Sequence, residues 1–151
     1  MGERRRVFTG SMCDIFDNRA PEAWRADLWR LIAATPDLTW MLLTKRPQNI
    51  AGMLPPDWGA GWRNVWLGCT AENQAEAARR IPALLEIPAA AVRFLSVEPM
   101  LETVDLGRWL GPGFRRARSG QEISPARACD SPPGRAQVGG CTFFARPGRL
   151  S

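Results

Sequence analysis

Short apolar runs alternate with helix-like patterns over the first 110 residues. Four of these runs are typical of strands, because they are nearly continuous in apolar residues and can be covered on both faces of a sheet. They span residues 7–9, 38–44, 65–69 and 92–97. Between them, apolar residues recur at helical spacing. Strand and helix in alternation favour right-handed crossovers, so we predict an α/β fold of parallel βα repeats.

Four such units amount to about half of a (β/α)8 barrel, which typically has about 250 residues. An open, doubly wound sheet of four strands fits the same pattern and stays an alternative. The segment between the first two strands puts four apolar residues on one helical stripe, namely Trp24, Leu28, Leu31 and Ile32. Because Trp24, Trp40 and Trp66 lie on apolar stripes, we expect all three indoles in the core.

Residues 111–151 break this rhythm. They are rich in arginine, glycine and proline and show no clear apolar period; Val138 and Cys141–Phe144 are their only plausible strand. Such composition is typical of disorder, and a change of reading frame in GC-rich DNA would produce a similar amino-acid sequence. We therefore divide the chain into a partial βα-barrel domain, residues 1–110, and an irregular tail, residues 111–151.

The net charge of +5 comes from this tail, which has seven arginines against Glu122 and Asp130. The rest of the chain is balanced in charge. A basic surface favours a nucleic-acid partner, and here only the tail supports that interpretation.

The remaining composition narrows the possible chemistry. The four cysteines, Cys13, Cys69, Cys129 and Cys141, are widely spaced, and no CxxC motif occurs. We therefore predict neither a zinc nor an iron–sulfur site within the chain. The chain has no histidine, which excludes His-based triads and His-ligated metals. No signal peptide or bilayer-spanning stretch is visible, so we expect a cytoplasmic protein without a membrane partner.

Polar side chains follow each predicted strand, and in parallel βα folds the ligand lies at the carboxyl ends of the strands. The candidates are Ser11 and Asp14 after the first strand, Thr44, Lys45 and Arg46 after the second, Glu72 and Asn73 after the third, and Ser96 and Glu98 at the fourth. Together they predict a site for a polar, charged ligand.

Each candidate also has a purely structural interpretation. Lys45 and Arg46 can clamp a phosphate or carboxylate, or be two solvated cations. Glu72 and Asn73 can reach a ribose or an amine, or cap the next helix. Ser11 and Asp14 can be loop hydrogen-bonding residues. For Glu98 the structural interpretation is the weakest of the set, because a lone carboxylate directly after a buried strand has no evident structural role.

Four blocks at these strand ends occur in the order found in a known family: Ser11–Phe16 (SMCDIF), Leu43–Pro47 (LTKRP), Asn64–Gly68 (NVWLG) with Glu72-Asn73, and Phe94–Pro99 (FLSVEP). On these blocks the sequence resembles an uncharacterised phage and bacterial protein family that is similar to radical S-adenosylmethionine enzymes. The resemblance covers about residues 6–110 and implies a partial barrel.

In that family a three-cysteine motif before the first block would hold a [4Fe–4S] cluster, and a Gly-Gly-Glu-Ser-Gly strand follows the last block. This chain has neither motif, and Gly120-Gln121-Glu122 matches the Gly-Gly-Glu-Ser-Gly strand only in part. We therefore interpret the chain as a fragment that has no cofactor of its own and is inactive alone. S-adenosylmethionine and the cluster are implied only for a complete family member.

For a complete member, the resemblance implies that Glu72, Asn73 and Glu98 bind the amine or ribose of S-adenosylmethionine. Ser11, Asp14, Thr44, Lys45, Arg46 and Ser96 would then contact a substrate, either a polar small molecule or a nucleic acid. Two other hypotheses stay open. One is a nucleic-acid-binding module acting through the basic tail, and the other is a degraded reading frame without function, whose open sheet edges would favour self-association.

Overall fold

The computed structural model describes residues 4–10, 12–99, 101–109, 114–118 and 141–145. Four strands alternate with helices, as predicted. The chain runs through β1 (Arg6–Thr9), α1 (Glu22–Ala34), β2 (Thr39–Thr44), α2 (Pro47–Ile50), the 3₁₀ turn η1 (Ala51–Met53), β3 (Val65–Thr70), α3 (Gln74–Leu85) and β4 (Val92–Val97). Strands β5 (Phe114–Arg118) and β6 (Cys141–Ala145) follow.

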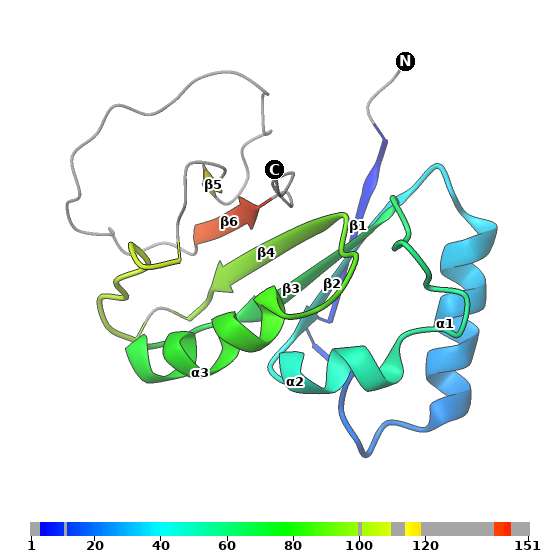
Figure 1. Cartoon of the computed structure of the whole chain (residues 1–151), viewed down its shortest axis with the longest axis horizontal. Helices are drawn as coiled ribbons and strands as arrows, with labels where there is room; N and C mark the ends of the chain where they lie inside the picture. The colour runs from blue at the N-terminus through cyan, green and yellow to red at the C-terminus, as the bar shows by residue number, and fades with distance from the viewer. Residues whose placement is uncertain (1–3, 11, 100, 110–113, 119–140, 146–151) are drawn as a thin grey trace.

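The strands form one sheet in the order β1-β2-β3-β4-β6-β5 (Figure 1). Strands β1 to β4 pair in parallel, which confirms the predicted α/β fold of parallel repeats. All six residues of β2 are buried, as its continuous apolar sequence predicts for an inner strand.

The helices of the described part cover one face of the parallel strands (Figure 1). Alternate strand residues such as Leu42, Leu67 and Leu95 join Ile32 of α1 and Ile81 of α3 in the main core. The intervening positions form a second, smaller cluster on the opposite face, made of Met41, Leu43 and Phe94 with Trp66 packed against it. Helices on one face are the arrangement of a βα barrel, whereas a doubly wound sheet has helices on both faces.

The tail contributes to the same sheet. Strand β6 pairs antiparallel with β4, and β5 pairs antiparallel with β6. The predicted strand at Cys141–Phe144 is confirmed, whereas β5 was not anticipated, because its arginine-rich sequence has no apolar alternation. The edge of β4 is therefore occupied by β6, and the strands at the two ends of the sheet, β1 and β5, each have a single partner strand among the described residues.

The prediction that Trp24 belongs to the core is wrong. Its side chain is 71% exposed, and that of Leu31 is 49% exposed. Leu28 and Ile32 of the predicted stripe do face the core, but helix α1 is rotated so that Trp29 is buried, whereas Trp24 and Leu31 are exposed. Trp40 is buried and Trp66 half-buried, as expected for strand residues of the sheet.

Candidate functional site

The carboxyl ends of β1 to β4 lie along one edge of the sheet, as the predicted site requires. The register pairs Thr44 with Cys69 and Thr70 with Ser96, so the last residues of β2, β3 and β4 are neighbours. We call this edge, with the loops that leave it, the carboxyl edge. It brings Asp14, Thr44, Lys45, Arg46 and Glu72 into one network; Ser11 lies outside the described residues.

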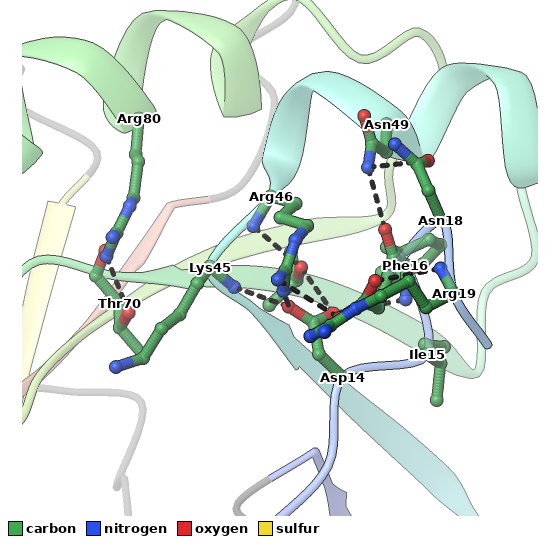
Figure 2. A network of polar contacts seen from close by, with 12 residues as sticks. Asp14, Ile15, Phe16, Asn18, Arg19, Lys45, Arg46, Asn49, Thr70 and Arg80 are labelled. Atoms are coloured by element: carbon green, nitrogen blue, oxygen red, sulfur yellow. Dashed lines mark hydrogen bonds and ion pairs between the residues drawn. The ribbon is translucent and has the colours of Figure 1, made fainter.

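Asp14 is the centre of the first half of this network (Figure 2). Its Oδ1 accepts hydrogen bonds from the Thr44 hydroxyl at 2.7 Å and from the Phe16 amide at 3.1 Å. Its Oδ2 accepts from the Lys45 amide at 3.1 Å and from Arg46 Nη1 at 3.0 Å. Both oxygens are therefore engaged, and Asp14 ties the loop after β1 to the end of β2.

The backbone of the loop before Asp14 explains how this loop approaches β2 closely enough for Asp14 to bond to the end of that strand. Gly10 has a φ of +95°, and a Cβ built on it would lie 2.4 Å from the Leu43 carbonyl oxygen. Only glycine fits this backbone conformation and this approach to β2. The loop is held further by Asn49, whose Nδ2 donates to the Phe16 carbonyl at 2.8 Å.

Arg46 bridges two carboxylates of the same loop. Its Nη1 lies 3.0 Å from Asp14 Oδ2 and its Nη2 lies 3.0 Å from Asp17 Oδ2. The pKa of Asp17 is lowered, first by hydrogen bonds from the Arg19 backbone and side chain and then by the charge of Arg46. In this conformation Arg46 organises the loop, and its side chain is still 35% exposed to solvent.

The second half of the network is a chain of four charges between β2, β3 and α3. Lys45 Nζ lies 2.8 Å from Glu72 Oε1, and Arg80 Nη1 lies 2.7 Å from Glu72 Oε2. Arg80 Nη2 lies 2.6 Å from Glu76 Oε2. Figure 2 shows Arg80 descending from α3 toward Thr70, whose carbonyl and hydroxyl oxygens accept from Nη1 at 3.0 and 2.9 Å.

The members of this chain differ sharply in their exposure to solvent. The side chains of Glu72 and Arg80 are 10% and 8% exposed, whereas that of Lys45 is 57% exposed. Burial opposes ionisation of Glu72, but the hydrogen bond from Lys45 and the nearby positive charges outweigh it and lower its pKa. Glu72 is thus a buried carboxylate with one fixed partner, Arg80, and one partner that reaches it from solvent.

The other candidates have structural roles or stand apart. Asn73 caps α3, with its Oδ1 accepting from the Glu76 amide at 2.8 Å, which is the helix-cap alternative for this residue. Ser96 is buried, and its carbonyl accepts from the Ala71 amide. Glu98 is exposed, and no hydrogen bond or ion pair joins it to another described residue.

Sequence reasoning missed Arg80, Glu76 and Asp17. The first two could have been found, because an acid and an arginine four residues apart on a helix commonly pair. Asp17 had no such signal, since its partner Arg46 comes from a distant part of the chain. In Arg80 the Nε atom is buried without a hydrogen-bond partner in the described part of the protein.

The described residues do not fit an iron–sulfur cluster. Cys13 is exposed on the loop after β1, whereas Cys69 is buried in the core. Burial raises the pKa of the Cys69 thiol to about 12, so the thiolate that a metal requires is disfavoured. Within the described ranges, no three His, Cys, Asp or Glu side chains are grouped so that they could hold a metal ion.

Among the described helices, none combines the length and apolar character needed to cross a bilayer.

No curated protein matches the chain, and no solved structure matches it. A family model described as "Protein of unknown function (DUF5131)" matches residues 1–127. The match runs past residue 110, where we placed the end of the barrel-like domain, and includes β5. Because it covers most of the sequence, the chain belongs to the DUF5131 family of proteins of unknown function.

Proposed function

We propose that the carboxyl edge is the binding site for a small molecule that carries both an amine and a carboxylate, with S-adenosylmethionine as the expected ligand. In this proposal the chain is part of a phage-type family similar to radical S-adenosylmethionine enzymes, and its sheet is about half of a barrel. The one-sided cover of the sheet by helices supports the barrel. The blocks at the strand ends support the family relationship.

One observation carries the binding proposal: in the ion pair between Lys45 and Glu72, the side chain of Lys45 is 57% exposed, whereas that of Glu72 is 10% exposed. Glu72 is held in place by Arg80 from the buried side, and Lys45 reaches it from solvent at 2.8 Å. A ligand ammonium can replace Lys45 on Glu72 Oε1, and the displaced Lys45 can then pair with the ligand carboxylate. This exchange breaks one ion pair and forms two, so Glu72 keeps a cationic partner and is not left as an unpaired buried charge.

The neighbouring residues suit the remainder of such a ligand. The exposed carboxylate of Glu98 can accept hydrogen bonds from ribose hydroxyls. Asp14 and Arg46 keep the loop after β1 in position beside the edge. Because the described cysteines do not fit a cluster, we propose binding without turnover for this chain, and no iron uptake on anaerobic reconstitution.

Calorimetric titration with S-adenosylhomocysteine and with methylthioadenosine tests the exchange. The two probes share the nucleoside, and only the first has the amino-acid group. We expect S-adenosylhomocysteine to bind at least about tenfold more tightly, because its two charges each gain a partner at the edge. We expect Glu72→Gln and Lys45→Met to abolish this preference.

The matched control is Arg30→Met on α1, which removes an exposed arginine from a surface pair with Asp27. It should leave both affinities unchanged. Equal binding of the two probes to the unmodified chain, or loss of the preference in the Arg30 variant, would contradict the exchange.

A nucleic-acid substrate or partner is the second proposal, and it depends on the basic tail. The net charge of +5 comes from residues 112–151, and strand β5 contains Arg115, Arg116 and Arg118 in five residues. Phosphate contacts make binding strongly dependent on salt. Replacing these three arginines by glutamine in the full chain should weaken DNA or RNA binding and reduce its salt dependence.

Two further proposals concern assembly and origin. The unpaired edge of β1 is where a second copy or another βα unit can add a strand. In the alternative that the chain is a degraded reading frame, it should aggregate and lack a cooperative unfolding transition. A monomeric, cooperative transition would exclude that alternative.

A further inference from the structure

A cavity of about 380 Å³ lies between α1 and the segment that connects η1 to β3. Its wall includes Arg25, Ala26 and Trp29 from α1, Met53 from the end of η1, and Leu54 and Trp62 from the connection. It shares no residue with the Lys45–Glu72–Arg80 network. Its volume is within the range of small-molecule sites, roughly 300–1,000 Å³.

Two tryptophans, Trp29 and Trp62, belong to the wall of this cavity, and a third, Trp58, packs against both of them. The ring centroids of Trp29 and Trp62 are 5.7 Å apart and nearly perpendicular. Trp58 packs against both, at 6.1 Å from Trp29 and 6.0 Å from Trp62. The indole nitrogens of Trp29 and Trp62 donate to the carbonyls of Met53 and Asp57, at 3.1 and 3.4 Å. With their N–H groups used, these two residues offer apolar ring surface to the cavity.

Arg25 supplies a cation to the same wall. Its Nη1 donates to the Ile15 carbonyl at 2.9 Å, and it forms no ion pair with a carboxylate of the described residues. The other arginine of the wall, Arg30, is already paired with Asp27. The wall's two carboxylates, Glu22 and Asp57, belong to residues exposed to solvent. Among the described residues, the half-buried Arg25 is therefore a cation without an ion-pair partner beside an aromatic surface.

We propose that this cavity binds a planar aromatic carboxylate. Aromatic rings pack favourably on indoles in offset or edge-to-face geometry. The planar fork of a guanidinium matches a carboxylate, and the resulting hydrogen bonds are about twice as strong as those between neutral groups. The aromatic part of the ligand lies against Trp29 and Trp62, and its carboxylate pairs with Arg25. This site is independent of the one proposed at the carboxyl edge.

Calorimetric titration of the full chain with 2-naphthoate and with 2-naphthylmethanol tests the proposal, since the two probes share one ring system and differ in charge. We expect 2-naphthoate to bind about tenfold more tightly, as a charge-assisted hydrogen bond predicts. Arg25→Met should remove this difference and leave the binding of the alcohol as it was. Equal affinities for the two probes in the unmodified chain would overturn the proposal.

A second variant keeps the test independent of the hydrogen bond between Arg25 and Ile15. Ala26 is exposed on α1 and borders the cavity, so Ala26→Leu should fill it without harm to the helix and weaken 2-naphthoate binding at least about tenfold. Ala23 is also exposed on α1 but lies outside the cavity wall, so the Ala23→Leu variant should bind 2-naphthoate as tightly as the unmodified chain does. Unchanged binding in the Ala26 variant would place the probe elsewhere and refute this site. S-adenosylhomocysteine binding should be the same in both variants, whether or not the edge proposal holds.

Discussion

The two ion pairs of Glu72 should contribute very differently to stability, because their burial differs. Lys45 is 57% exposed and Arg80 is 8% exposed, although their distances to Glu72 are nearly the same, 2.8 and 2.7 Å. An exposed pair is screened by solvent and contributes about 0.2–1 kcal/mol. Removal of one partner of a buried pair costs about 3–5 kcal/mol, because it leaves a buried charge unpaired.

Glu76 should lower the cost of losing Glu72, because its own ion pair with Arg80, at 2.6 Å, leaves Arg80 with one carboxylate partner. We therefore expect Glu72→Gln to lower the free energy of unfolding by about 3 kcal/mol, the lower end of that range. Lys45→Met should cost less than about 1 kcal/mol.

Double-mutant cycles measure each pair separately. The variants are Glu72→Gln, Arg80→Met and Lys45→Met, singly and in the two pairs that contain Glu72. Urea unfolding can be followed by the fluorescence of the seven tryptophans. We expect a coupling energy of about 2 kcal/mol for Glu72 with Arg80, and less than about 1 kcal/mol for Glu72 with Lys45.

The surface pair of Arg30 with Asp27 is the internal control, because both side chains are mostly exposed; its coupling should be below about 0.5 kcal/mol. A coupling of Glu72 with Lys45 as large as that with Arg80 would refute the reasoning. It would also remove the basis for exchange of Lys45 by a ligand.

Three further predictions concern the core, the thiols and the response to acid. Gly68→Ala should destabilise the chain by about 1–3 kcal/mol in urea unfolding, because its Cβ would lie 2.5 Å from ring carbons of the buried Phe94. Phe94→Leu in the Gly68→Ala background should recover part of this loss. An unfolding midpoint unchanged by Gly68→Ala would contradict the prediction and show that the Phe94 ring moves aside. Peptide mass spectrometry after iodoacetamide treatment at pH 8 should find Cys13 alkylated and Cys69 intact until urea is added, because burial raises the pKa of Cys69 to about 12; early modification of Cys69 would contradict this packing. The lowered pKa of Glu72 stabilises the fold above its ordinary value of 4.5, so the free energy of unfolding should fall as pH drops below that value; the fall should be smaller in Glu72→Gln, and equal slopes would assign the acid response to other groups.

The sequence by itself determined the repeating architecture. Continuous apolar runs and helical spacing are local patterns, and they fixed the four parallel strands and the helices between them. They also placed Asp14, Lys45, Arg46 and Glu72 at one edge, because parallel strands end on the same side of a sheet. Local pattern could not set the rotation of α1, which depends on the packing of Trp29 against Trp58 and Trp62.

Only the tertiary structure decided how the polar residues are partnered. Whether Asp14 and Arg46 face a ligand or each other depends on contacts between segments about 30 residues apart. Arg80 and Glu72 are close in sequence, but they meet only because α3 packs over the end of β3. The cavity beside α1 and the antiparallel pairing of β6 with β4 also arise from distant segments. Local patterns limit which residues reach an edge, but the balance of burial and charge that selects their partners is set only when the chain has packed.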